Sequence, residues 1–194
     1  MESPDPYPPQ SYHTLTSSRS IYVDFTGWSQ KIIHVADGSP SGATIYTVDL
    51  ASQKPQMKFF AAGESTTPLA TVVVRANSNL EVTIHGHKLA IETKTRLKKE
   101  GKYNSPLLAN APFTWKSRSM KVVDFELRDT NAIPLAQFNP QPSWHRRKAG
   151  RLDLFGPSVS NGRVMEEIMV TAFALVHSTN IQLEAAAGES GAFA

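Results

Sequence analysis

The sequence predicts a mostly β protein, a sandwich or barrel of about eleven strands that encloses one hydrophobic helix. Two observations support this fold class. Short runs of β-branched and aromatic residues recur roughly every eight to twelve residues, and turn-forming residues separate them. One segment near the C-terminus, 164–178, is long enough for a helix and almost continuously apolar. Strand runs and helical segments do not alternate, so a parallel βαβ sheet is excluded.

The strands are predicted in order along the chain. The first five are "SIYVDF", "KIIHVA", "TIYTVDL", "QMKFFA" and "LATVVVRA". The next two form a hairpin, because apolar residues occupy positions 80, 82 and 84 before Gly86 and positions 89 and 91 after it. A tight turn between paired strands requires such a change of parity. The remaining candidates are "PFTWKS", "KVVDFELRD", "IPLAQFN" and "RLDLF".

The apolar segment "VMEEIMVTAFALVHS" is predicted to be a buried helix. With a rise of about 1.5 Å per residue it is about 22 Å long, which is too short for a bilayer core of about 30 Å. It does not have one polar face, because Ile168 and Leu175 on one side are matched by Val170 and Phe173 on the other. We therefore expect a helix over about residues 163–178, inside the strands and not across a membrane.

Composition predicts one globular domain with two tails. The 194 residues are 40% hydrophobic and 19% charged, as in soluble globular proteins. We expect a disordered tail rich in Pro and Ser over residues 1–18, the barrel domain over 19–179, and a flexible tail over 180–194. The N-terminal stretch lacks the basic and apolar regions of a signal peptide, so we expect a cytoplasmic protein, with peripheral membrane attachment left open.

Charge and cysteine usage exclude several classes of protein. Twenty Lys and Arg against 17 Asp and Glu give a net charge of +3, which is too small an excess to predict nucleic-acid binding. The absence of cysteine excludes disulfides, thiol nucleophiles and Cys-ligated metals. We expect no cofactor.

Four ordered features between residues 112 and 178 resemble a known superfamily. They are "FTWKS", the strand pair "VVDFELRDTNAIPLAQFNP", "AGRLDLF" and the helix "VMEEIMVTAFAL". In these the chain resembles the tubby C-terminal-like superfamily, which includes tubby proteins, LURP-one-related proteins and phospholipid scramblases, and it is most similar to small fungal members without an assigned activity. Over residues 20–111 the resemblance is architectural. It implies an antiparallel barrel of about twelve strands around a central hydrophobic helix.

The resemblance also has functional implications. Tubby domains bind phosphoinositide headgroups through basic residues on the barrel exterior. Scramblases have an acylated cysteine stretch and a calcium-linked segment, so scramblase activity is not expected of a chain without cysteine.

Two loops concentrate positive charge, one beside Trp144 and one before "YNSP". Their basic residues are Arg146, Arg147, Lys148 and Arg151 in the first, and Lys98, Lys99 and Lys102 in the second. Each such side chain near an anionic membrane contributes about 1 kcal/mol to binding. We predict a non-enzymatic binding or adaptor domain that engages an anionic membrane surface or a phosphorylated ligand through these loops. RNA is disfavoured, because aromatic residues do not alternate with the charges.

Two other interpretations stay open. His85 and His87 are two residues apart and Glu92 follows, a pattern that loosely resembles a metal site, so a metal-dependent β-barrel enzyme is one alternative. The turn at Gly86 favours surface histidines instead, and no catalytic motif is found, since "GSPSG" has Pro40 where a nucleophilic serine would stand. The other alternative is a structural protein-interaction domain, with an unknown protein partner and no small-molecule ligand.

Overall fold

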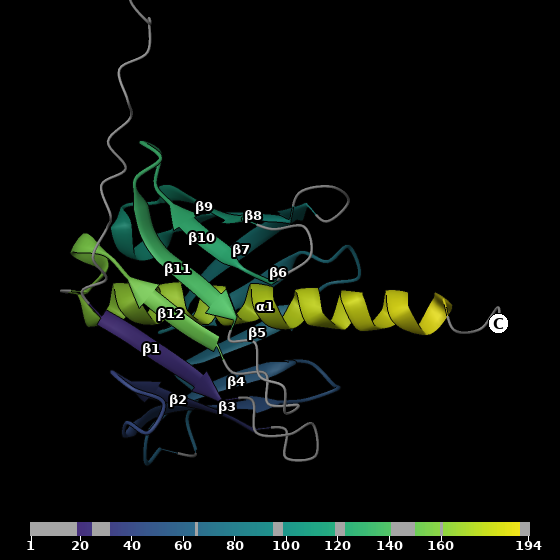
Figure 1. Ribbon diagram of the computed structural model, residues 1–194, viewed down its shortest axis with the longest axis horizontal. Coiled ribbons are helices and arrows are strands. Elements are labelled where there is room, and N and C mark those ends of the chain that lie inside the picture. Colours follow the sequence, from purple (N-terminus) through teal and green to yellow (C-terminus); the bar gives the residue numbers. More distant parts are fainter. Residues whose placement is uncertain are drawn as a thin grey trace, which may run out of the picture.

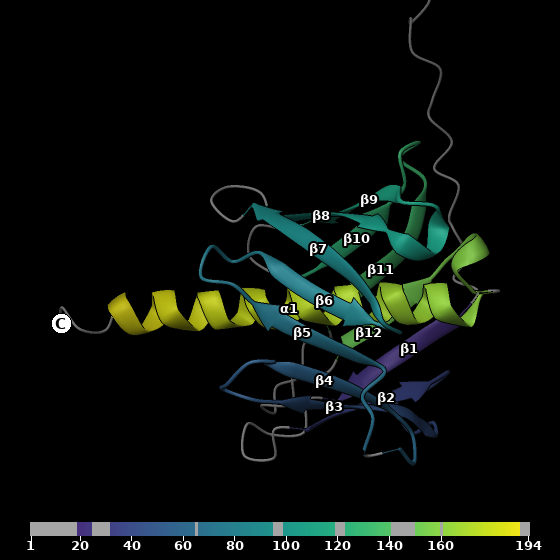
Figure 2. The same ribbon diagram turned by 180° about the vertical axis from the view of Figure 1, so that it is seen from behind.

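The computed structural model is a closed barrel of twelve antiparallel strands with one long helix through its centre (Figures 1 and 2). It describes residues 19–24, 32–64, 66–94, 99–118, 123–140, 150–159 and 161–190. The strands are β1 (Arg19–Asp24), β2 (Ile32–Asp37), β3 (Thr44–Leu50), β4 (Met57–Ala61), β5 (Ala70–Val74), β6 (Leu80–Ile84), β7 (His87–Lys94), β8 (Glu100–Ser105), β9 (Ala111–Ser117), β10 (Phe125–Arg128), β11 (Pro134–Pro140) and β12 (Gly150–Leu154). The helical elements are the short 3-10 helices η1 (Pro106–Leu108) and η2 (Gly156–Val159) and the α-helix α1 (Gly162–Ser190). The predicted fold class is confirmed, as a barrel and not a sandwich.

Each strand pairs with its neighbours in the sequence, and β1 pairs with β12 to close the ring. The closing pairs include Arg19 opposite Leu154 and Val23 opposite Gly150. A side chain at Gly150 would not fit, because a Cβ there would lie 2.3 Å from the Phe138 ring. Among the described strands, closure leaves no free edge to which another chain could pair.

The predicted hairpin between β6 and β7 is confirmed. Leu80 pairs with Ile91, and Ile84 pairs with His87 across the turn. His85 and Gly86 both have positive φ angles, 47° and 82°. Two residues of this kind form the tight turn whose twist matches that of the strands it joins.

Strand β8 was not predicted, because its segment is polar enough to resemble a loop. Its inward-facing residues are Gly101, Tyr103 and Ser105, of which only Tyr103 is large. Small residues are needed here because α1 passes close to the wall. A Cβ on Gly101 would lie 2.9 Å from Leu175 Cδ2 of the helix. The period of two is therefore visible in burial but not in hydrophobicity.

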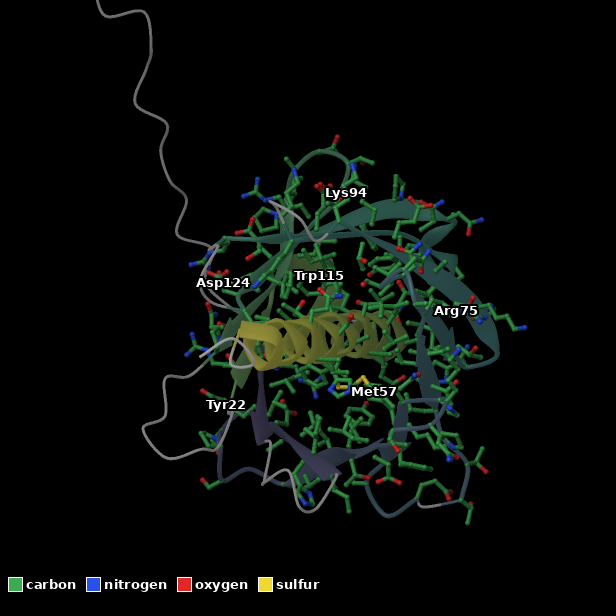
Figure 3. The ribbon with its side chains drawn as sticks, turned by 90° about the vertical axis from the view of Figure 1, so that its right-hand side faces the viewer. Tyr22, Met57, Arg75, Lys94, Trp115 and Asp124 are labelled. Atoms are coloured by element: carbon green, nitrogen blue, oxygen red, sulfur yellow. The ribbon has the colours of Figure 1, made fainter. Side chains whose placement is uncertain are left out.

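Helix α1 fills the barrel, as Figure 3 shows in a view along its axis. The Phe173 ring lies between Phe59 of β4 and Phe138 of β11, with ring centroids 6.5 and 6.3 Å away. Those two strands are far apart around the ring. Ile168 and Met169 are also fully buried. Burial of each such side chain contributes about 1.5–3 kcal/mol as an upper estimate, so the helix supplies a large part of the core.

The helix is longer than predicted. It continues to Ser190, whereas the sequence predicted an end near residue 178 and a flexible tail over 180–194. The segment 183–187 consists of Leu, Glu and Ala, which have high helix propensity, and no proline interrupts it. No helix among the described residues combines the length and the apolar character that a membrane crossing requires.

We expect Phe173→Asp to abolish soluble folding, because it would place an unpaired charge in the core. Ile181→Asp is the matched control, since Ile181 lies on the same helix but is 41% exposed. Soluble yield and circular dichroism of both variants test this expectation. A folded, soluble Phe173→Asp variant would contradict the buried position of the helix.

Candidate functional site

The barrel has two ends, which differ in their loops. At the start rim, defined here by the beginning of α1, η1 and the turn at His85–Gly86, the helix enters the barrel. At the exit rim the helix leaves it. Two pairs of neighbouring strands define the exit rim here. Lys94 at the end of β7 pairs with Glu100 at the start of β8, and Pro140 at the end of β11 pairs with Gly150 at the start of β12. Figure 1 shows the exit rim on the right.

Both predicted basic loops connect strands that end at the exit rim. Lys98, Arg146, Arg147 and Lys148 lie outside the described residues, whereas Lys99, Lys102 and Arg151 are described. Only β9 and β10 separate β8 from β11. With strands about 4.8 Å apart, the two loops begin about 14 Å from each other along the wall. The described strand ends that flank the two loops therefore lie on the same part of the barrel rim.

Of the three described candidates Lys99, Lys102 and Arg151, Lys99 is the one whose side-chain nitrogen has no hydrogen-bond partner among the described residues. Its Nζ atom is also shielded from solvent. It lines a cavity of about 10 Å³ where α1 leaves the barrel, together with Lys94, Ser178 and Thr179. Such a volume holds about one water molecule. Because Glu100 also lines the cavity, the positive charge there is partly balanced.

Lys102 and Arg151 already have acidic partners. Lys102 Nζ lies 3.3 Å from Glu100 Oε1. The Nε–H of Arg151 donates to Asp153 Oδ2 over 2.9 Å, and the same carboxylate accepts from Ser20 and Asn139. This network joins β1, β11 and β12 where the barrel closes, so Arg151 has a structural role that its sequence context did not indicate.

A second polar constellation, the rim latch, consists of Tyr46, His85 and Glu166 at the start rim. The Tyr46 hydroxyl donates to Glu166 Oε1 over 2.7 Å, and His85 Nε2–H donates to Glu166 Oε2 over 2.6 Å. Burial, and then the hydrogen bond to Glu166, raise the pKa of Tyr46, so its phenol stays protonated. The latch ties β3 and the β6–β7 turn to the first turns of α1.

His85 occupies a backbone conformation that favours glycine and in which histidine is uncommon. From this conformation His85 Nε2 reaches Glu166, and the His85 side chain is 25% exposed. His87, by contrast, is exposed on β7. The two histidines therefore face different surroundings. No group of three or more His, Asp and Glu in the described residues is placed to hold a metal ion.

Sequence reasoning did not connect the members of the rim latch. His85 was predicted to be a surface turn residue, and nothing in its local sequence pairs it with Glu166. They are 81 positions apart, and Tyr46 is 120 positions from Glu166. No local spacing can reveal such a contact, because closure of the barrel creates it.

The sequence matches no protein-family model, and no curated protein or solved structure shows significant similarity to it.

We expect Glu166→Ala to lower the free energy of unfolding by about 1–3 kcal/mol, because it leaves two half-buried hydrogen-bond donors without an acceptor. Chemical denaturation measures the loss. The control is Glu81→Ala, which removes the exposed ion pair with Arg75 and should change stability little. Figure 3 shows Arg75 pointing away from the barrel. Equal, small losses in both variants would show that the latch contributes nothing.

Proposed function

We propose that this protein is a non-enzymatic binding module that engages anionic lipid headgroups, phosphoinositides among them, through the basic loops of its exit rim. The main support is topological. Two basic segments that are far apart in the sequence connect strands ending at the same end of the barrel. The resemblance to tubby-like proteins, and hence distant membership of that superfamily, is part of this proposal.

Electrostatics supports an exit-rim ligand with negative charge. Lys94 ends β7 at this rim and Lys99 directly precedes β8. The segments with Lys98, Arg146, Arg147 and Lys148 follow or precede strand ends at the same rim. At physiological ionic strength the screening length is about 8 Å. Because the loops begin about 14 Å apart, each acts mainly on the phosphate groups nearest to it. Binding would then depend on several contacts of about 1 kcal/mol each.

The position of α1 restricts the direction of approach. Figure 2 shows the helix projecting beyond the barrel at the exit rim. A flat membrane cannot meet this rim along the barrel axis without meeting the helix first. We therefore propose a binding surface on the flank between β7 and β12, used by a peripheral protein in the cytoplasm.

The metal-dependent enzyme has less support. His85 is already held by Glu166, and the described residues contain no three-ligand group. A structural protein-interaction domain differs from the lipid-binding module in one measurable respect, because it needs no charge at the exit rim.

Liposome co-sedimentation at physiological salt tests the proposal. We expect binding to vesicles that contain phosphoinositides and none to neutral phosphatidylcholine vesicles. Replacing Arg146, Arg147 and Lys148 together by Ala should weaken binding on the order of 100-fold, from about 1 kcal/mol per charge. Competition by a soluble inositol phosphate distinguishes a phosphorylated small ligand from a membrane surface.

A single substitution tests the contribution of Lys94, an exposed residue at the exit-rim end of β7. Lys94→Met keeps the apolar stem and removes the charge, so binding should weaken about fivefold with folding unchanged. Lys88→Met is the matched control, because Lys88 is an exposed residue near the start-rim end of β7. Equally negligible binding to both kinds of vesicle would refute the lipid-binding function, and equal effects of the two Met variants would refute the exit-rim location.

A further inference from the structure

A cluster of buried oxygen atoms lies inside the barrel between β8 and α1. It consists of Tyr103, Ser105 and Glu167, whose residues are 4%, 0% and 0% exposed. None of their four side-chain oxygen atoms makes a hydrogen bond of standard geometry with another described residue. Buried polar groups nearly always have partners, so a fully buried carboxyl in this state needs a physical explanation.

The surroundings of Glu167 contain no compensating cation among the described residues that act on it. Burial raises the pKa of the carboxyl, although the hydroxyls of Ser105 and Tyr103 and the N–H of Leu107 in η1 act in the opposite direction. Burial and then the charge of Glu167 raise the pKa of Tyr103 as well, so the phenol stays protonated. Tyr103 is therefore the one titratable described neighbour that faces Glu167.

The remaining polar neighbours do not titrate. On the next turn of α1, Thr171 Oγ1 donates to the Ile168 carbonyl and accepts from Trp115 Nε1–H of β9, each over 3.1 Å. Figure 3 shows Trp115 close to α1 inside the ring of strands. The adjacent Glu166 is directed elsewhere, to the rim latch. The Glu167 cluster is thus separate from both sites described above.

An ionised carboxylate in this position would lack a counter-charge and would cost several kcal/mol. A neutral carboxylic acid avoids that cost and gains an O–H donor for the hydroxyl oxygens beside it. We propose that Glu167 is a proton-binding site built into the barrel, where the neutral acid hydrogen-bonds within the Tyr103 and Ser105 cluster and its ionisation loosens the packing of α1 against β8.

The direction of the pH dependence follows from which state binds more protons. The folded state holds its proton to higher pH than the unfolded chain, whose Glu has the ordinary value of 4.5. The contribution of Glu167 to stability is therefore fully present below that value. It is lost as pH rises toward the raised pKa of the folded state, and no further loss occurs above it.

Thermal unfolding of the full chain at about pH 5 and about pH 8 tests the proposal. The variants are Glu167→Gln, a neutral side chain of the same size, and Glu92→Gln, an exposed control on β7. We expect Glu167→Gln to match the wild type at the lower pH and to melt higher at the upper one. The gap should be about 3 °C for each unit by which the pKa is raised. Glu92→Gln should follow the wild type.

Infrared spectroscopy of the wild type gives an independent measurement should Glu167→Gln fail to fold. A carbonyl band of a protonated carboxyl that persists to higher pH than the bands of exposed carboxyls is the expected result, because the pKa of Glu167 is raised. Absence of that band, or identical pH dependence of wild type and Glu167→Gln, would overturn the proposal. Stabilisation by sodium or potassium but not by tetramethylammonium would also overturn it, because a metal cation would then neutralise the carboxylate.

Discussion

The enclosure of α1 by the barrel wall is the interaction on which the rest of the structure depends. Twelve strands close into a ring too wide for their own side chains to fill, so without a central element the wall would surround an unfilled space. The helix needs the wall equally, because it has no polar face to present to water. Beside Leu175 of the helix the wall has Gly101, and around Phe173 it has Phe59 and Phe138. The size of the wall residues is therefore set by the helix.

Because α1 is enclosed, its polar residues decide how the helix is oriented inside the barrel. An apolar cylinder inside an apolar ring can rotate or slide with little change in buried area, since hydrophobic burial is not directional. Glu166 and Thr171 provide the directional contacts, to the start rim and to β9 respectively. Both residues are on one short part of the helix, where these contacts fix its rotation relative to the wall.

The sequence predicted those features that depend on local patterns. The change in the alternation of apolar residues at Gly86 predicted a hairpin, and the recurring β-branched runs predicted most strands. The apolar residues on all sides of the helix predicted its position inside the barrel. Features that depend on closure of the ring were missed. β8 has small inner residues because a helix that comes later in the sequence passes beside it, and Glu166 meets His85 only after distant strands have met. The basic loops were visible as composition, whereas their position at one common rim is a property of the topology.

Helix α1 follows all twelve strands in the chain, and this order has a consequence for biosynthesis. Each strand can pair with its predecessor as the ribosome releases it, so a curved sheet can grow from the N-terminal side. Helix α1, which packs against the inner face of that sheet, is synthesised only after the final strand. Until then the growing chain exposes an apolar concave surface of the kind that chaperones bind and that aggregation exploits. Productive folding is therefore a late event, because the segment that fills the interior of the barrel is synthesised after all twelve strands.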